Sequence, residues 1–533
     1  MARPSRRARQ HLQRAISRHG LVDRRAFLAT GLALSSWPLF PLSRSVAADR
    51  SVRLADYPFT LGVASGDPQP QGVVLWTRLA PKPLEGGGMP PEDVPVSWQV
   101  ATDEAMTKVV QSGTTTAPAR LAHSVHVEVE GLEPARTYWY RFQAAGEASP
   151  GGRTRTAPPA ESTPDRLRFA FASCQHYETG LFTALEHLSR EDLDLIVHLG
   201  DYIYEGAASN GKTRKHVGGE LTTLDDYRNR HAQYKTDPHL QAAHASAPWL
   251  VTWDDHEFDN NYAGAISEEP NILLEEFLAR RAAAYQAYYE HMPLRSAQIP
   301  RGPDLQLYRS VRFGKLAEFD ILDTRQFRTD QPNGDGNKPP SDAIMHPEAT
   351  LLGKQQEAWL FETLGQSQAR WNILAQQVMM ARVDRVPGDA VAYSMDQWPG
   401  YEVNRRRVLK FMADRGVANP VVLTGDIHTN WVNDLKVNYD EPAAATVATE
   451  FVGTSITSGG DGGQTRADTA GVLAENPFVK FYNAERGYVR CEVTPDAWKS
   501  DYRVVEYVTR PGAKCLTRAS FVVEDGQPGA KPG

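Results

Sequence analysis

Residues 55–158 are dominated by short runs in which apolar and polar residues alternate, separated by glycine and proline turns. Four runs have the alternation and the β-branched and aromatic content of strands: residues 73–76, 96–100, 123–130 and 138–142. No stretch of helical period interrupts them. The pattern therefore predicts a small N-terminal β-sandwich at 55–158.

The turn before the last of these strands carries a second sign of a sandwich. The segment from Leu132 to Tyr138 resembles the tyrosine corner of fibronectin type III domains. His123 and His126 are three apart on one predicted strand, so they point to opposite faces and make a poor chelating pair. We therefore expect a fibronectin III-like sandwich whose residues build a core rather than an active site.

Beyond a linker at 156–164, rich in threonine, proline and alanine, the pattern changes to apolar runs that alternate with stretches of helical spacing. Strands are expected at 167–172, 193–199, 249–253, 317–322, 371–374 and 420–423, and helices at 273–289, 355–365 and 403–414. Because these strands are apolar along their whole length, both of their faces are expected to be buried. The sequence thus predicts a layered α/β domain at 165–515.

Residues 1–48 differ from the rest of the chain in charge. They hold nine arginines, no lysine and one acid, Asp23, for a net charge of +8. Arg24 and Arg25 precede a modest apolar run at 27–42, which resembles a twin-arginine signal peptide; a disordered basic tail is the alternative. The signal predicts export by the Tat machinery to a periplasmic or secreted location.

Composition and charge exclude several classes of protein. The 533 residues are 41% hydrophobic and 23% charged, which is ordinary for globular domains. No run approaches the roughly 20 apolar residues of a membrane span, so no transmembrane anchor is expected. The whole chain carries −7, so removing the +8 signal leaves −15 on the body. Such a body is a poor partner for nucleic acid and a good one for metal cations.

Several predicted strands of the second domain run directly into side chains that bind metals. The ends are Ser173-Cys174-Gln175-His176, Gly200-Asp201-Tyr202-Ile203-Tyr204, Asp254-Asp255-His256-Glu257 followed by Asn261, Asp323-Thr324-Arg325, and Gly425-Asp426-Ile427-His428. Ligands of open α/β sheets bind at the carboxyl ends of strands, so these groups are expected to converge. We interpret them as a metal cluster rather than as solvated loop charges.

These segments resemble sequence blocks of the metallophosphoesterase superfamily. Gly200-Asp201-x-x-Tyr204 is similar to GDxxY, Asp254-Asp255-His256-Glu257 to GNH(D/E), and Gly425-Asp426-Ile427-His428 to GHxH. Ser-Cys-Gln at 173–175 replaces the usual opening aspartate, as in the PhoD-type alkaline phosphatases that the chain resembles over most of its length. The resemblance implies a metallophosphoesterase-like catalytic domain that contains Fe3+ and Ca2+.

The resemblance also implies a ligand set. Cys174 and Tyr204 would ligate the ferric ion, with Asp201 bridging. The further metal ligands would be Asp255, Asn261, Asp426 and His428. Thiolate, phenolate and carboxylate donors suit Fe3+, and the oxygen-rich remainder suits Ca2+. Because the opening aspartate and one histidine of other branches are missing, a dinuclear zinc or iron–zinc centre is disfavoured.

Two further residues are candidates for catalytic roles. His256 is expected to form a hydrogen bond or to protonate the leaving group rather than to bind metal. Arg325 could bind the substrate phosphate through its planar fork, or it could belong to a buried network with Asp323.

Four more side chains have structural alternatives. Trp398 and Tyr401 are expected to shape the rim of the pocket. Cys491 and Cys515 are expected either to form a disulfide after export, which is slightly favoured, or simply to be buried.

The leading hypothesis is an exported, monomeric, metal-dependent alkaline phosphatase or phosphodiesterase. It would hydrolyse phosphate esters to inorganic phosphate with a metal-activated water as nucleophile. One alternative is a phospholipase D-type phosphodiesterase on the same framework. Another is an exported, non-catalytic surface-binding protein. An exported redox protein is disfavoured, because the sequence has no dinucleotide-binding or haem-attachment motif.

Overall fold

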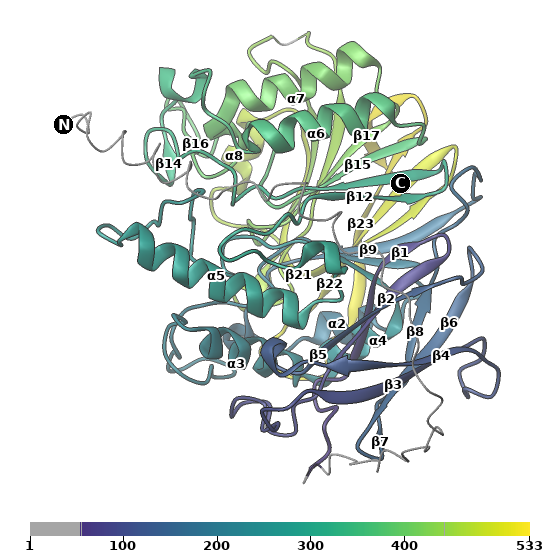
Figure 1. Cartoon of the computed structure of the whole chain (residues 1–533). Helices are drawn as coiled ribbons and strands as arrows, with labels where there is room; N and C mark the ends of the chain where they lie inside the picture. The colour runs from purple at the N-terminus through teal and green to yellow at the C-terminus, as the bar shows by residue number, and fades with distance from the viewer. Residues whose placement is uncertain (1–53, 55, 442) are drawn as a thin grey trace, which may run out of the picture. The chain divides into compact units, whose positions relative to one another are not determined.

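The computed structural model describes residues 54, 56–441 and 443–533, so the predicted signal at 1–48 lies outside the described residues. The described chain is a mixed α/β protein with an N-terminal β-rich domain and a large sheet-containing domain (Figure 1). Within these ranges, no helix combines the length and the apolar character needed to cross a bilayer.

The N-terminal domain is built from two antiparallel sheets. One contains β1 (Val63–Gln69), β2 (Gly72–Arg78) and β5 (Ser124–Glu130), and the other contains β3 (Val94–Ala101), β4 (Val109–Ala117), β6 (Thr137–Ala144), β7 (Glu147–Ala148) and β8 (Gly152–Arg155). Alternate residues of both sheets, such as Leu75, Val96 and Tyr140, form one buried core. All four strands expected from the sequence are confirmed, and β1, β4, β7 and β8 complete the sandwich.

The tyrosine corner is present at the predicted place. The hydroxyl of Tyr138 accepts a hydrogen bond from the backbone N–H of Glu133 at 2.9 Å. On β5, Nε2 of His126 lies 3.0 Å from the carbonyl oxygens of Tyr289 and Met292, at the end of helix α5 (Leu274–His291). His126 thus fastens the sandwich to the second domain.

The second domain contains two sheets that share one long strand. In the first sheet β9 (Leu167–Ala172), β10 (Leu195–His198) and β11 (Trp249–Val251) run parallel, and β9 also pairs with β21 (Val479–Val493), which leads on to β22 (Ala497–Val505), β23 (Cys515–Glu524) and β24 (Gln527–Pro532). The sheet thus continues past residue 515. At its other edge β11 pairs with β1, so the sandwich and this sheet are continuous.

The second sheet has a parallel centre. Its order is β12 (Arg309–Phe313), β13 (Ala317–Ile321), β15 (Trp371–Ala375), β17 (Pro420–Thr424), β19 (Ala448–Val452) and β18 (Asn430–Leu435), and β18 pairs with β21. All six strands expected for this domain are therefore found in the two sheets. The remaining short strands are β14 (Asn337–Lys338), β16 (Tyr393–Ser394) and β20 (Gly462–Gly463).

The two sheets pack against each other and are covered by helices on their outer faces (Figure 1). Phe169 and Phe319, from different sheets, meet edge to face at 5.2 Å in the core between them. Helices α2 (Thr183–Leu188), α3 (Leu224–Lys235), α4 (Pro238–Ser246) and α5 cover the first sheet, and α6 (Gly353–Gln366), α7 (Glu402–Arg415) and α8 (Thr469–Glu475) cover the second. The helices expected from the sequence correspond to α5, α6 and α7. This layering buries the strands on both faces, as their apolar character predicted.

Two structural expectations are corrected. Cys491 and Cys515 are free thiols. They lie on the two sides of β22, opposite Ser500 and Val505. Five residues of strand separate those positions by about 16 Å, far beyond the reach of a disulfide.

Trp398 and Tyr401 do not form a pocket rim, because both are fully buried in the core beneath the second sheet. The indole of Trp398 donates to Oε1 of Gln376 at 3.1 Å, and the hydroxyl of Tyr401 donates to the carbonyl of Thr329 at 2.8 Å. Their polar atoms are thus used to anchor loops.

Candidate metal centre

Four of the predicted ligands follow the carboxyl ends of four strands. Cys174 comes two residues after β9, Asp201 three after β10, Asp255 four after β11 and Asp426 two after β17. The first two loops are joined by a backbone hydrogen bond of 3.0 Å from the N–H of Cys174 to the carbonyl of Gly200. Because the two sheets pack with these ends on the same side, residues distant in sequence meet at one place.

The loops carry an unusual backbone conformation. Five of the nine predicted site residues have positive φ angles between 47° and 63°: Cys174, Asp201, Asn261, Asp426 and His428. Such angles are uncommon for residues with a Cβ and gather at functional sites. Gly200 adopts φ 105°, and a Cβ there would lie 2.5 Å from the backbone nitrogen of Asp254. The close approach of the two loops therefore requires glycine at this position.

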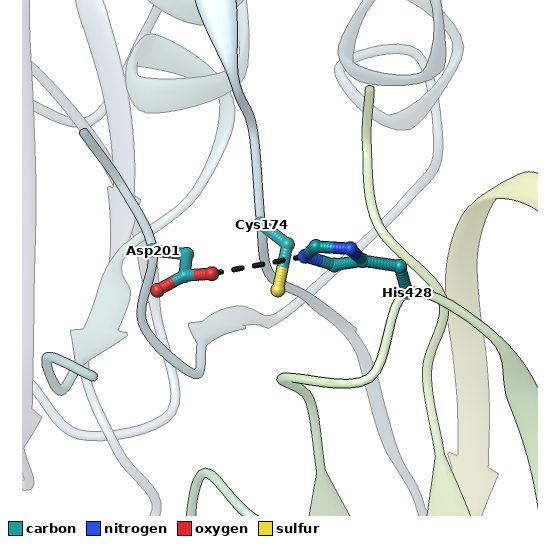
Figure 2. A group of neighbouring side chains, drawn as sticks. All are labelled: Cys174, Asp201 and His428. Carbon is teal, nitrogen blue, oxygen red and sulfur yellow. Dashed lines mark ion pairs between the residues drawn. The ribbon is translucent and has the colours of Figure 1, made fainter. Parts of the chain in front are cut away.

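Cys174, Asp201 and His428 form the first ligand group, with donor atoms that all lie within 4.8 Å of one another. Figure 2 shows the three side chains converging, with Nε2 of His428 3.9 Å from Oδ2 of Asp201. Tyr204 joins them, since its hydroxyl donates to the same Asp201 oxygen at 2.7 Å and lies 3.3 Å from Nε2 of His428. Cys174, Tyr204 and the bridging Asp201 are the residues that the sequence assigned to iron, and the structure adds His428 to them.

Two more groups extend the centre. Asp201, Asp255 and His256 form one, and Asp254, Asp255 and Asp426 form the other. Asp201 and Asp255 are each shared between groups, so the three groups are continuous. Oδ1 of Asp201 and Oδ2 of Asp254 are buried without a hydrogen-bond partner in the described part of the chain. Buried carboxylate oxygens are costly without a partner, and a cation would supply one.

Asn261 lies at the edge of these groups. Its backbone N–H donates to Oδ2 of Asp255 at 2.8 Å, and its side-chain nitrogen donates to Asp335 at 2.7 Å. The amide is thereby oriented while its oxygen stays available as a hard ligand.

Protonation of the metal-free site also fits cation binding. Burial raises the pKa values of Cys174 and Tyr204 well above their ordinary ranges, and repulsion from Asp201 is the second cause. Burial likewise raises the pKa of Asp426 to about 7. A cation would reverse these shifts and release the protons. The donor set of thiol, phenol, imidazole and several carboxylates therefore fits bound metal.

Arg325 lies inside the carboxylate cluster and is fully buried. Its Nη1 contacts both oxygens of Asp396 at 2.8 Å, while Nη2 lies 3.5 Å from Asp255 and 3.3 Å from Asp426. Nε bonds to Asp254. Of the two alternatives that the sequence left open, this favours the buried network. The guanidinium partners, however, are these four aspartates. Asp323 accepts a hydrogen bond from the backbone N–H of Arg325 and not from its side chain.

His256 is at the surface of the centre. Its Nδ1 lies 2.8 Å from Oε2 of Glu205, and its ring packs against Tyr204 with centroids 4.2 Å apart. The side chain is 22% exposed. Burial alone would lower the pKa of His256, but Glu205, Asp255 and Asp201 outweigh it and raise the pKa well above the ordinary value. These carboxylates therefore favour the protonated imidazole in the metal-free site.

Several functional neighbours were missed by the sequence analysis. Oxygens of the Glu257 carboxylate accept backbone N–H groups of Asp201, Tyr202 and Asp254 and so hold two ligand loops together. Ser458 donates to the carbonyl of Cys174 at 2.8 Å and lies 2.6 Å from the Tyr204 hydroxyl. Glu257 is the last residue of the Asp254-Asp255-His256-Glu257 motif, so the sequence offered a signal for it. No sequence pattern marks Ser458.

Comparisons with known proteins agree along the chain. A family model described as "PhoD-like phosphatase" matches residues 169–502, and one described as "PhoD-like phosphatase, N-terminal domain" matches 45–158. The chain is 52% identical over 531 residues to "Alkaline phosphatase D" of Bacillus subtilis (strain 168), covering 98% of this chain and 91% of that protein. A solved structure described as "Structure of PhoD" is similar with a TM-score of 0.88 at 55% identity, covering 90% and 93% of the two chains.

Proposed function

Because the chain belongs to the PhoD-like phosphatase family and is a phosphoric ester hydrolase, we propose that it hydrolyses its substrates at this centre with one ferric ion and calcium. The supporting observation is the continuity of the three ligand groups through Asp201 and Asp255. Because the family is one of hydrolases, the alternative of a non-catalytic surface-binding protein is rejected. The phospholipase D-type phosphodiesterase stays a prediction.

The donor types divide the proposed centre into two parts. Cys174, Tyr204 and His428 lie around Asp201 and supply a thiol, a phenol and an imidazole. A ferric ion favours anionic donors such as thiolate, phenolate and carboxylate. The remaining donors are oxygens, as calcium requires: Asp201, Asp254, Asp255, Asn261 and Asp426. When bound, the metal ions would neutralise phosphate oxygens and lower the pKa of a water molecule.

The chain's own residues would position and protonate the substrate. Glu205 holds Nδ1 of His256, which leaves Nε2 to donate a proton to the departing oxygen of the ester. Glu257 fixes the loops of Asp201 and Asp254 through backbone N–H groups. Arg325 keeps the aspartates together without an exposed face for substrate. The products would be inorganic phosphate and an alcohol.

Calcium is expected to support activity where zinc does not. A calcium-selective chelator should reduce release of nitrophenol from nitrophenyl phosphate to background, and Ca2+ but not Zn2+ should restore it, because the oxygen-rich ligand group lacks further nitrogen donors. Activity that resists the chelator, or that returns with zinc alone, would contradict the proposal.

A matched pair of cysteine variants controls this experiment. Cys174→Ser should lose iron and its visible thiolate-to-iron absorption, whereas Cys491→Ser should keep both, since Cys491 is an equally buried thiol on β21 outside the ligand groups. Equal iron contents in the two variants would remove Cys174 from the ligand set.

We also propose that the protein is exported through the Tat machinery and works as a single chain. The support for export is the pair Arg24 and Arg25 before a weak apolar run. Replacing both by lysine preserves charge but removes the guanidinium pair, so full-length protein should accumulate in the cytoplasm. Cell fractionation measures the outcome. Unchanged delivery of mature protein beginning near Asp49 would show that the paired arginines are incidental.

A further inference from the structure

A pocket of about 270 Å³ opens beside the metal centre. Its walls come from β18, β21, α8 and the segments around β16, and its lining includes Arg385, Gln397, Trp431, Arg466 and Tyr482. None of these side chains has a part in the proposed reaction. The pocket is therefore a candidate for recognition of a part of the substrate that does not react.

Gln397 joins this pocket to the metal centre. Its Nε2 donates to Oδ2 of Asp426 at 2.9 Å, and its Oε1 accepts a hydrogen bond from Nη2 of Arg385 at 3.0 Å. A single amide group thus separates the guanidinium of Arg385 from a predicted metal ligand. A substrate bound with its phosphate ester at the metal centre would therefore extend its neighbouring groups toward the pocket.

Arg385 and Arg466 bring positive charge into the pocket. Among the described residues, no carboxylate lies within ion-pair distance of the Arg385 or Arg466 guanidinium, although Asp468 also lines the pocket. Arg385 instead packs over the ring of Trp431, 5.3 Å from its centroid, and Arg466 is exposed. Burial lowers the pKa of Arg385 to about 10; attraction by Asp426 opposes that effect, and repulsion by Arg466 adds to it. Arg385 therefore stays charged at neutral pH.

We propose that this pocket is a subsite for a second phosphate group, carried on the leaving side of the ester. The assignment deepens the proposed function and rests on it. Guanidinium groups bind phosphate oxygens through parallel N–H donors, and two of them match a doubly charged group. An apolar leaving group would instead cover the arginines without offering them a partner, which is unfavourable.

The specificity test compares alkanediol bisphosphates of increasing spacer length with the matching alkyl monophosphates. At the best spacer, kcat/KM for the bisphosphate should exceed that for the monophosphate by about tenfold or more, since charged hydrogen bonds contribute on this scale. In Arg385→Gln combined with Arg466→Gln this ratio should fall to near one. Replacing Arg385 could displace Gln397 and so disturb Asp426. Because both substrates are hydrolysed at the same centre, such an effect cancels in the ratio.

Arg301→Gln is the control for the loss of charge. Arg301 is exposed and lies in a different pocket, without an ion pair in the described residues, so its variant should keep both the ratio and the activity. Capping the second phosphate as a methyl ester separates a phosphodiester from a terminal phosphate as the occupant.

Binding of alkane bisphosphonates, which are not hydrolysed, gives a readout that does not depend on turnover. Calorimetry should show tighter binding of the bisphosphonate than of the monophosphonate to the wild type, and equal binding to the double variant. Hydrolysis of monophosphates with a ratio near one at every spacer would overturn the subsite and leave the proposed function standing. Failure to hydrolyse either series would contradict the proposed function, and the bisphosphonate affinities would then still decide for or against the subsite.

Discussion

Replacing Asp201 by asparagine is expected to lower kcat for nitrophenyl phosphate by about 10³-fold or more and to reduce the bound metal. Asp201 belongs to two ligand groups, so one neutralised carboxylate weakens both. Burial alone would raise the pKa of Asp201, but His256, His428 and the hydrogen bond from Tyr204 outweigh it and hold the pKa below the ordinary value. The group is thus a carboxylate before metal binds, and its charge is what the substitution removes. Metal analysis and steady-state kinetics measure the effect.

Asp67→Asn provides the matched control. Asp67 is buried to a similar degree, also has a positive φ, and pairs with Arg309 at 2.7 Å outside the three ligand groups. Its variant should lose stability while keeping metal content and kcat. Equal loss of activity in both variants would indicate a folding defect, and full activity in Asp201→Asn would exclude Asp201 as an essential ligand.

The sequence predicted six strands of the second domain for a physical reason. The central strands are buried on both faces, so their apolar runs are continuous and easily seen. Helix α3 was missed because its buried face contains polar residues, among them Arg230, His231 and Lys235. His231 stacks on His291 at 4.9 Å, an arrangement that hydrophobic spacing cannot indicate.

The site was predictable where it depends on local order along the chain. A strand that ends just before Asp201 or Asp426 places that residue at the carboxyl edge of the sheet, independently of the rest of the fold. The partners of Arg325 were not predictable in this way. Asp396 reaches it across 71 residues, from the loop before the short helix that contains Trp398. Only the packing of that loop decides whether Arg325 faces solvent or carboxylates.

That packing leads to a prediction about stability. Arg325→Met is expected to lower the free energy of unfolding of the metal-free protein by about 3–5 kcal/mol, because it leaves buried aspartates without their shared cation. With calcium bound the loss should be smaller, since the metal supplies compensating charge among Asp254, Asp255 and Asp426. Denaturant unfolding with and without Ca2+ measures the difference. Arg325→Lys should recover part of the loss, because lysine keeps the charge without the planar fork.

Arg405→Met separates this effect from ordinary loss of a buried ion pair. Arg405 is as fully buried as Arg325, but it pairs with Glu402 within helix α7, and neither residue belongs to a ligand group. Its variant should be destabilised equally with and without calcium. If Arg325→Met instead raised KM for nitrophenyl phosphate and left unfolding unchanged, Arg325 would be a substrate ligand. A calcium-dependent loss of stability confined to Arg325→Met would place its role in holding the aspartates together, so that the protein folds around a negatively charged site before metal arrives.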